Sequence, residues 1–278
     1  MAAHDGIRTE THMLMYFPGT GTWNLFDLEN DPHEMKSVHT HPAYFDVFQQ
    51  MKHRYAELRK EYLISSATVP AHRLGEGWWR ERHLAKVAEA RKGGHEVVFI
   101  GDSITQGWEG HGRAAWEKFH APRKSLNLGF SGDRTEHVLW RLRNGELDKV
   151  DPKLFVIMIG TNNTGQRQDD PADTANGVRL IVELLRDRSP QATILLLAVF
   201  PRDETPQGRL RKINDRVNAA IAPLADGDHV RWLDLNSYFL TPEGMLTPEV
   251  MPDFLHPQEH GYRIWAETME PVIAEMLQ

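Results

Sequence analysis

Residues 98–105 read Val98-Phe99-Ile100-Gly101-Asp102-Ser103-Ile104-Thr105. A short apolar run that passes through a glycine into a polar turn, and then into a helical stretch, is typical of a buried strand followed by a helix. Strands that are apolar on both faces belong to parallel sheets covered by helices on both sides. The segment therefore predicts such a strand, with Ser103 at the N-terminus of the helix that follows it.

The same alternation continues outward from this segment, between about Ala71 and the C-terminus. Five strands are predicted, at residues 97–100, 125–128, 154–159, 193–199 and 230–235. Between and after them, apolar residues recur at helical spacing, as in residues 178–185, 210–224 and 262–276. This pattern predicts an α/β fold with a flavodoxin-like, doubly wound, five-stranded parallel sheet. Ligands of such folds bind outside the carboxyl ends of the strands.

Composition excludes several classes of protein. The chain has 278 residues and no cysteine, so a disulfide scaffold, a thiolate metal site and a cysteine nucleophile are ruled out. Its 32 basic and 39 acidic residues give a net charge of −7, with the basic residues scattered, which argues against a nucleic-acid partner. His39 and His41 lack a third ligand nearby, so no metal site is expected.

Apolar runs in this sequence are too short to cross a bilayer. The longest, Ile194 to Phe200, is well below the 18 or more residues that a spanning helix needs. The first thirty residues also lack the apolar stretch of a signal peptide. No membrane span is expected, and a cytoplasmic location is expected unless the chain is a fragment whose export signal is missing.

The N-terminal part reads differently from the rest. Two short aromatic-rich strands, at 13–17 and 23–27, flank a hairpin-like turn at residues 18–21. An amphipathic helix follows, with its apolar face formed by Tyr44, Phe48, Met51, Tyr55, Leu58 and Tyr62. We therefore divide the chain into an appendage, residues 1–65, and a larger domain, residues 66–278. The aromatic face is expected to pack on the larger domain or on a second subunit, so a homo-oligomer is left open.

Polar residues follow the predicted strands at one edge of the sheet. Ser103 follows the first strand, Gly132 the second and Asn162 the third, while Asp253 and His256 precede the last helix. Each residue alone is well explained as a cap or a turn. Together they supply a nucleophile, oxyanion donors, an acid and a base, which is the set that acyl transfer requires.

Four blocks in these loops resemble the SGNH, or GDSL, hydrolase family: Gly101-Asp102-Ser103, Gly132, Gly160-Thr161-Asn162-Asn163 and Asp253-x-x-His256. The similarity runs from about Trp79 to the C-terminus. It is greatest to the catalytic subunits of platelet-activating-factor acetylhydrolase, through Val97 to Ser103, His137 to Leu142, Asn144 to Leu147 and Asp253 to His256.

This resemblance implies an acyl ester hydrolase that uses no metal or organic cofactor. Ser103 would be the nucleophile, His256 the general base and Asp253 the residue that orients it. The backbone N–H groups of Ser103 and Gly132 and the side-chain amide of Asn162 would form the oxyanion hole.

The resemblance also guides expectations about the substrate. A short acyl group, above all acetyl, is favoured by the acetylhydrolase-like relatives and by Ile104 and Leu255, bulky neighbours of the nucleophile and the base that would close the acyl pocket. The substrate would be a small acyl ester or an acetylated sugar. Two alternatives are a thioesterase or longer-chain lipase, and a binding or scaffolding protein without turnover.

A second resemblance concerns the first sixty or so residues, which look like the C-terminal tail of sulfatases. It is carried by Gly6 to Thr9, Trp23 to Met35 and Leu58 to Lys60. Sulfatase activity is not implied, because the chain contains nothing like the signature in which the activated sulfatase residue forms. The appendage is expected to be structural, and the sharper hypothesis is that it helps to wall the substrate site.

Overall fold

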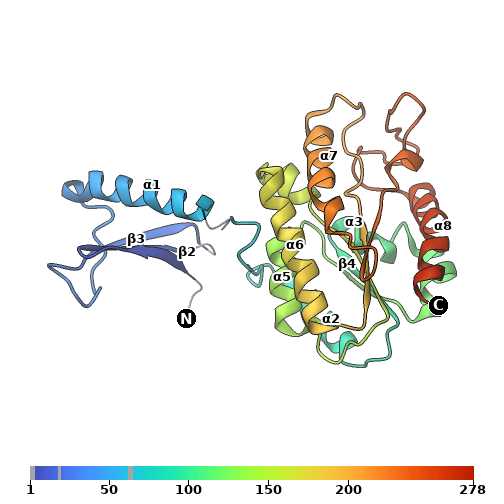
Figure 1. Cartoon of the computed structure of the whole chain (residues 1–278), viewed down its shortest axis with the longest axis horizontal. Coiled ribbons are helices and arrows are strands. Elements are labelled where there is room, and N and C mark those ends of the chain that lie inside the picture. The colour runs from blue at the N-terminus through green and yellow to red at the C-terminus, as the bar shows by residue number, and fades with distance from the viewer. Residues whose placement is uncertain (1–3, 18–19, 62–64) are drawn as a thin grey trace.

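The computed structural model describes residues 4–17, 20–61 and 65–278. Figure 1 shows a small N-terminal lobe and a larger lobe, with a connecting segment, residues 65–73, leading from one to the other. Pro18 and Gly19 of the predicted turn, and Tyr62 of the predicted helix face, lie outside the described residues.

The larger lobe is built on one sheet of five parallel strands in the order β5-β4-β6-β7-β8. The strands are β4 (Val97–Gly101), β5 (Leu126–Gly129), β6 (Leu154–Met158), β7 (Thr193–Leu197) and β8 (Val230–Leu233). Numbered within the sheet this order is 2-1-3-4-5, the order of flavodoxin-like doubly wound folds. The predicted fold class is confirmed, and all five predicted strands are present.

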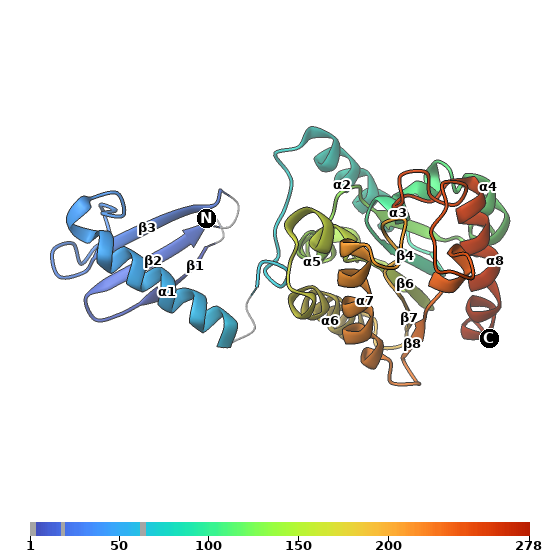
Figure 2. The same ribbon diagram turned by 90° about the horizontal axis from the view of Figure 1, so that it is seen from above.

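Helices cover both faces of this sheet, as Figures 1 and 2 show. One face is covered by α2 (Gly77–Ala90), α5 (Thr135–Arg141), α6 (Pro171–Arg188) and α7 (Arg209–Ile221), and the other by α8 (Glu259–Met276) with the short α4 (Arg113–Ala115). Because side chains alternate along a strand, Val98 and Ile100 enter the first core while Val97 and Phe99 enter the second.

Three strands, β6, β7 and β8, end earlier than predicted. β7 stops at Leu197, whereas the apolar run continues to Phe200. The reason is a side chain of α7: Asn218 Oδ1 accepts from the Val199 N–H at 2.8 Å and its Nδ2 donates to the Val199 carbonyl at 2.9 Å. The side-chain amide of Asn218 thus takes the place of the neighbouring strand as hydrogen-bond partner of the Val199 backbone. A pattern of apolar residues does not reveal such a partner.

The small lobe is a three-stranded antiparallel sheet covered by one helix. Its elements are β1 (Asp5–Arg8), β2 (His12–Phe17), β3 (Thr22–Asp27) and α1 (Phe45–Glu61). The sequence prediction of a strand pair missed β1, whose four residues include only one large apolar side chain, Ile7. Gly6 allows the close pairing, since a Cβ there would lie 2.0 Å from the Leu14 carbonyl oxygen.

The aromatic face of α1 packs on this small sheet. Met51 and Tyr55 form a core with Leu14 and Leu25, and the Tyr55 ring lies edge-on to Trp23 at a centroid distance of 5.1 Å. The expectation that this face would pack on the larger domain or a second subunit is therefore wrong. The small lobe buries its own apolar face because β1 and β2 complete a sheet wide enough to cover it.

The connecting segment is held by the larger lobe. Thr135 Oγ1 donates to the Ala67 carbonyl at 2.8 Å, and the Ala71 N–H donates to the Glu136 carbonyl at 3.1 Å. Ala67 is fully buried.

None of the helices within the described residues has the length and apolarity that crossing a membrane would require.

Candidate active site

Ser103 lies where β4 ends, between the loops that follow β5 and β6. The chain turns at Asp102, whose Oδ1 accepts from the Ile104 N–H at 3.0 Å, and α3 (Ser103–Gln106) begins there. Gly101 is required at this turn, since a Cβ would lie 2.1 Å from Thr105 Oγ1 and 2.5 Å from the Met158 carbonyl oxygen. This is the topological switch point of the sheet, where ligands of doubly wound folds bind.

The helix that starts at Ser103 is one turn long. Four residues cannot build a substantial helix dipole, so the dipole adds little here. What the turn does offer is the Ser103 N–H itself, which has no acceptor inside a helix that begins at this residue. Burial raises the pKa of the neighbouring Asp102 to about 7, while its hydrogen bond from Ile104 opposes the shift.

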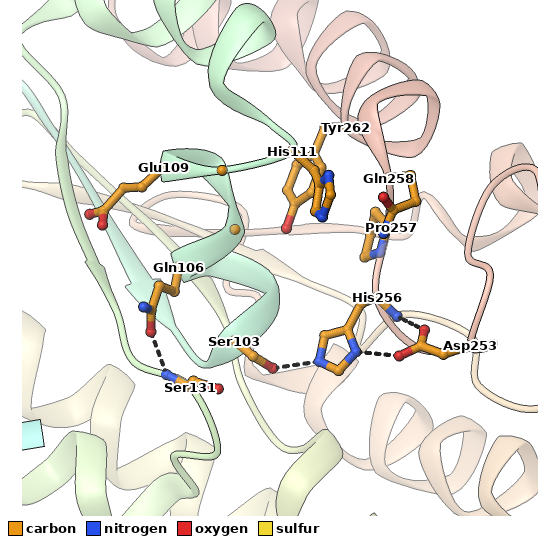
Figure 3. A pocket seen from close by; sticks show the side chains of 12 residues that line it. Ser103, Gln106, Glu109, His111, Ser131, Asp253, His256, Pro257, Gln258 and Tyr262 are labelled. Atoms are coloured by element: carbon orange, nitrogen blue, oxygen red, sulfur yellow. Dashed lines mark hydrogen bonds and ion pairs between the residues drawn. The ribbon is translucent and has the colours of Figure 1, made fainter. Parts of the chain in front are cut away.

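Figure 3 shows Ser103, His256 and Asp253 in line, joined by dashed hydrogen bonds, among the residues that line a cavity. Ser103 Oγ lies 2.9 Å from His256 Nε2, and His256 Nδ1 lies 2.6 Å from Asp253 Oδ2. Asp253 Oδ1 also accepts from the His256 N–H at 2.7 Å. The tight turn places Phe254 in the left-handed region at φ 55°. The structure thus brings together three residues separated by up to 153 positions.

The charge of Asp253 sets the imidazole tautomer. Partial burial disfavours the carboxylate, yet the hydrogen bonds from His256 outweigh it and hold the pKa of Asp253 below its ordinary value. An ionised carboxylate can only accept hydrogen bonds, so the imidazole carries its proton on Nδ1 and donates it in a hydrogen bond to Asp253. Nε2 is then unprotonated, with its lone pair toward Ser103. This arrangement allows the imidazole to accept the serine proton.

The predicted oxyanion donors lie on the two neighbouring loops. Gly132 has φ 72°, and its N–H has no acceptor among the described residues. Asn162 is buried; its Nδ2 donates to the Asp133 carbonyl at 2.9 Å and its Oδ1 accepts from Gln166 Nε2 at 3.2 Å. With one amide N–H fixed in this way, the second has a defined direction.

Beside Ser103, His256 and Asp253 is a cavity of about 610 Å³. Besides Ser103, Asp253 and His256 it is lined by Gln106, Gly107, Glu109, Gly110, His111, Ser131, Pro257, Gln258 and Tyr262. Ile104 is not among them: it is fully buried and packs in the core with Trp108. Leu255 also packs against that core and does not line the cavity. The expectation that these two residues close the acyl pocket is corrected, because Ile104 is buried in the core and the partly buried Leu255 packs against that core and is absent from the cavity wall.

Sequence reasoning missed the polar cavity residues. Gln106 is one: its Oε1 accepts from the Ser131 N–H at 2.7 Å, and this bond joins the turn at Ser103 to the Gly132 loop (Figure 3). Its place three residues after Ser103, on the same face of a helical turn, is a signal that could have found it. His111 and Gln258 carry no such signal, since only the tertiary structure brings them to the cavity.

A buried ionic network supports the loop after β5. Asp133 accepts from Trp79 Nε1 at 2.8 Å, from Arg141 Nε at 2.7 Å and from Arg73 Nη1 at 3.0 Å. Arg141 in turn pairs with the buried Glu146. Because charges this deeply buried must be paired, the network holds Asp133 in one position.

Within the described residues, no group of three acidic or histidine side chains could hold a metal ion.

Comparison with known proteins agrees with this geometry. The sequence model of the GDSL-like Lipase/Acylhydrolase family matches residues 99–264, and that of the N-sulphoglucosamine sulphohydrolase C-terminal region matches residues 1–61. The chain belongs to the GDSL acylhydrolase family, whose members hydrolyse carboxylic esters, and it has the SGNH hydrolase fold. Both resemblances inferred from the sequence are confirmed.

Among its relatives are subunits of platelet-activating factor acetylhydrolase, as the sequence resemblance implies. The chain is 36% identical to the human platelet-activating factor acetylhydrolase IB subunit alpha1 over 204 residues, which are 73% of this chain and 86% of the relative. It is 34% identical to the mouse subunit alpha2 over 205 residues, which are 73% and 87% of the two chains.

Solved structures share the fold. A putative platelet activating factor from Streptococcus pneumonia superimposes with a TM-score of 0.57 at 24% identity, over 72% of this chain and 96% of that one. The acetylxylan esterase Axe2 from Geobacillus stearothermophilus gives 0.52 at 19% identity, over 66% and 94%. At these identities the structures show a common fold.

Proposed function

We propose that this protein is a serine esterase that removes short acyl groups, acetyl first among them, from an alcohol. The observation that supports it is the hydrogen-bonded chain from Ser103 Oγ through His256 to Asp253, with distances of 2.9 and 2.6 Å. Nucleophile, base and orienting acid at these distances form the arrangement that acyl transfer to serine requires.

The proposed reaction has two halves. Ser103 Oγ attacks the ester carbonyl carbon while His256 Nε2 takes the hydroxyl proton, and the carbonyl oxygen becomes an oxyanion. Collapse of this intermediate breaks the bond to the alcohol oxygen, which receives the proton from His256. Water, activated by the same imidazole, then attacks the acyl-serine and releases the acid and free Ser103.

The oxyanion is proposed to be held by the N–H groups of Ser103 and Gly132 and by Asn162 Nδ2. Two features support this: the Gly132 N–H has no other acceptor among the described residues, and the Asn162 amide is oriented by its bond to the Asp133 carbonyl. Donors fixed in place before reaction stabilise developing charge without reorganisation.

The alcohol is proposed to be polar, with an acetylated sugar as the first candidate. Gln106, His111 and Gln258 line the cavity beside Ser103, so hydroxyl groups would find both donors and acceptors. Gly107, Gly110, Pro257 and Tyr262 give the same cavity an apolar side, so the ester series below decides between a short acyl group and the longer-chain lipase alternative. One solved structure of the same fold is an acetylxylan esterase. A cytoplasmic location and self-association stay predictions.

Hydrolysis of p-nitrophenyl esters from acetate to decanoate tests the proposal, with Ser103→Ala compared with the native chain. Activity that is highest on acetate and vanishes in Ser103→Ala is expected. Ser237→Ala is the control, because Ser237 is exposed, does not line the cavity and, within the described residues, accepts a hydrogen bond only through its backbone carbonyl, from the Leu240 N–H. Activity surviving in Ser103→Ala, or rising with chain length, would contradict the proposal.

Acetylated xylooligosaccharides and a phospholipid acetyl ester then separate the two kinds of alcohol. A higher kcat/KM on the sugar is expected if the polar cavity holds the alcohol. A preference for the phospholipid would instead assign the cavity to a lipid headgroup. Inactivity of the folded protein on every ester would favour the binding or scaffolding alternative.

A further inference from the structure

Arg73, at the end of the connecting segment, contacts the loop that carries Gly132. Its Nη1 donates to the Ser131 carbonyl oxygen at 2.7 Å and to Asp133 Oδ1 at 3.0 Å. These two residues flank Gly132. On its other edge the guanidinium is held by Glu76, with Nε–Oε1 at 2.8 Å and Nη2–Oε2 at 2.7 Å. Arg73 is mostly buried, with its side chain 19% exposed.

The Ser131 carbonyl and the Gly132 N–H belong to the same peptide group. This peptide is trans and planar, so the carbonyl oxygen and the N–H point in opposite directions. A hydrogen bond that holds the carbonyl toward Arg73 therefore holds the N–H away from Arg73. Gly132, at φ 72°, has no side chain to restrict rotation of this peptide, so the restriction must come from a partner.

The same loop also orients a second donor. The Asp133 carbonyl accepts from Asn162 Nδ2 at 2.9 Å, and the Asp133 carboxylate is one of the groups that Arg73 binds. Two of the three proposed oxyanion donors thus depend on residues 131–133. Gln106 fixes this loop through the Ser131 N–H at 2.7 Å, while Arg73 fixes it from the connecting segment.

We propose that Arg73 is a positioning residue that locks the Ser131–Gly132 peptide with its N–H directed at the oxyanion. The inference rests on the proposed function, because it assumes that this N–H stabilises the tetrahedral intermediate. Arginine suits the role, since its planar fork of donors binds a carbonyl and two carboxylates at once, whereas a lysine ammonium is a single flexible point. The residue precedes the region that the GDSL family model matches, which begins at residue 99.

Steady-state kinetics of Arg73→Ala and Arg73→Lys on p-nitrophenyl acetate test this role. We expect kcat to fall about 10- to 100-fold with KM nearly unchanged, because a misplaced group costs up to about 100-fold in rate. Arg73→Lys is expected to recover only part of the loss. Arg123→Ala is the matched control: Arg123 is 21% exposed, pairs with Glu270 and donates to the Phe119 carbonyl at 2.7 Å, and it does not line the cavity. It should lose stability and keep kcat.

A double-mutant cycle with Asn162→Ala separates positioning from a general structural effect. If Arg73 acts through the oxyanion hole, Arg73→Ala should cost less in the Asn162→Ala background than in the native chain. An equal cost in both backgrounds, or a native kcat in Arg73→Ala, would overturn the inference. If Arg73→Ala does not fold, as judged by thermal melting, the kcat of Arg73→Lys decides in the same way.

The Ser103→Ala variant distinguishes the two possible failures. Activity that survives in Ser103→Ala would remove the proposed function, and the Arg73 inference with it. Activity that vanishes in Ser103→Ala while Arg73→Ala and Arg73→Lys turn over like the native chain would remove the Arg73 inference alone.

Discussion

Acid should destabilise this protein through a buried histidine, and His120→Phe should remove much of the effect. His120 is fully buried, with the Phe99 ring at a centroid distance of 4.7 Å and the Trp108 ring at 4.9 Å. Neither ring nitrogen has a hydrogen-bond partner among the described residues. Burial, with a smaller contribution from Arg123, lowers the pKa of His120 to about 3.

The sign and size follow from proton binding in the two states. The unfolded chain binds a proton at this histidine below about pH 6.5, whereas the folded chain stays neutral until far lower pH. Stability is therefore fully present above pH 6.5 and is lost as the pH falls from there toward about 3. At pH 5 the loss from one such histidine is about 2 kcal/mol relative to pH 8.

His137 should add a comparable loss. Burial lowers its pKa to about 3 as well, and its Nδ1 accepts from the Arg134 N–H at 3.0 Å, which a protonated ring could not do. Together the two histidines make the native chain about 4 kcal/mol less stable at pH 5 than at pH 8. His120→Phe should halve this contribution and keep the aromatic packing.

Urea unfolding of the native chain and of His120→Phe at pH 8 and pH 5 measures the difference directly. Stability at pH 8 isolates the packing effect of the substitution, since the histidine is neutral in both states there, and groups other than His120 cancel between the two proteins. The pH-dependent loss should be about 2 kcal/mol smaller in His120→Phe. Equal losses in both proteins would refute the reasoning, because they would show that His120 takes up no extra proton on unfolding.

Three further outcomes are expected. Asn162→Ala should lower kcat/KM by about 2.7–4 kcal/mol of transition-state stabilisation, and an unchanged rate would remove Asn162 from the proposed site. Gly129→Ala should destabilise the fold by about 1–3 kcal/mol in urea unfolding and reduce turnover, because the added Cβ would lie 2.2 Å from the Gln106 backbone nitrogen. Gly75→Ala serves as the neutral control, since a Cβ at Gly75 would meet no atom within 4 Å. A chain of residues 65–278 should remain soluble and melt close to the native temperature, because the small lobe buries its apolar residues in a core of its own. Aggregation of that truncated chain would contradict the division near residue 65, which stays a prediction until then.

Local sequence patterns by themselves determined that the sheet is parallel and which polar side chains lie at its carboxyl edge. Continuous apolar runs such as Val97 to Ile100 report burial on both faces, which in a chain of alternating strands and helices leaves a parallel sheet as the natural solution. Because parallel strands end at one edge, the residues after them had to meet there, and Ser103, Asp253 and His256 do meet. Their chemistry depends on residue type and strand order, both of which can be read from the sequence.

Tertiary structure alone decided which distant groups satisfy buried polar atoms. The buried face of α7 includes Arg211, Asn214 and Asn218, which an apolar stripe does not predict, because these side chains bond to backbone atoms at the ends of other elements. The role proposed for Arg73 has the same origin. Hydrophobic periodicity reports whether a residue is buried, but a hydrogen bond across 58 residues depends on how the completed fold places its donor and acceptor.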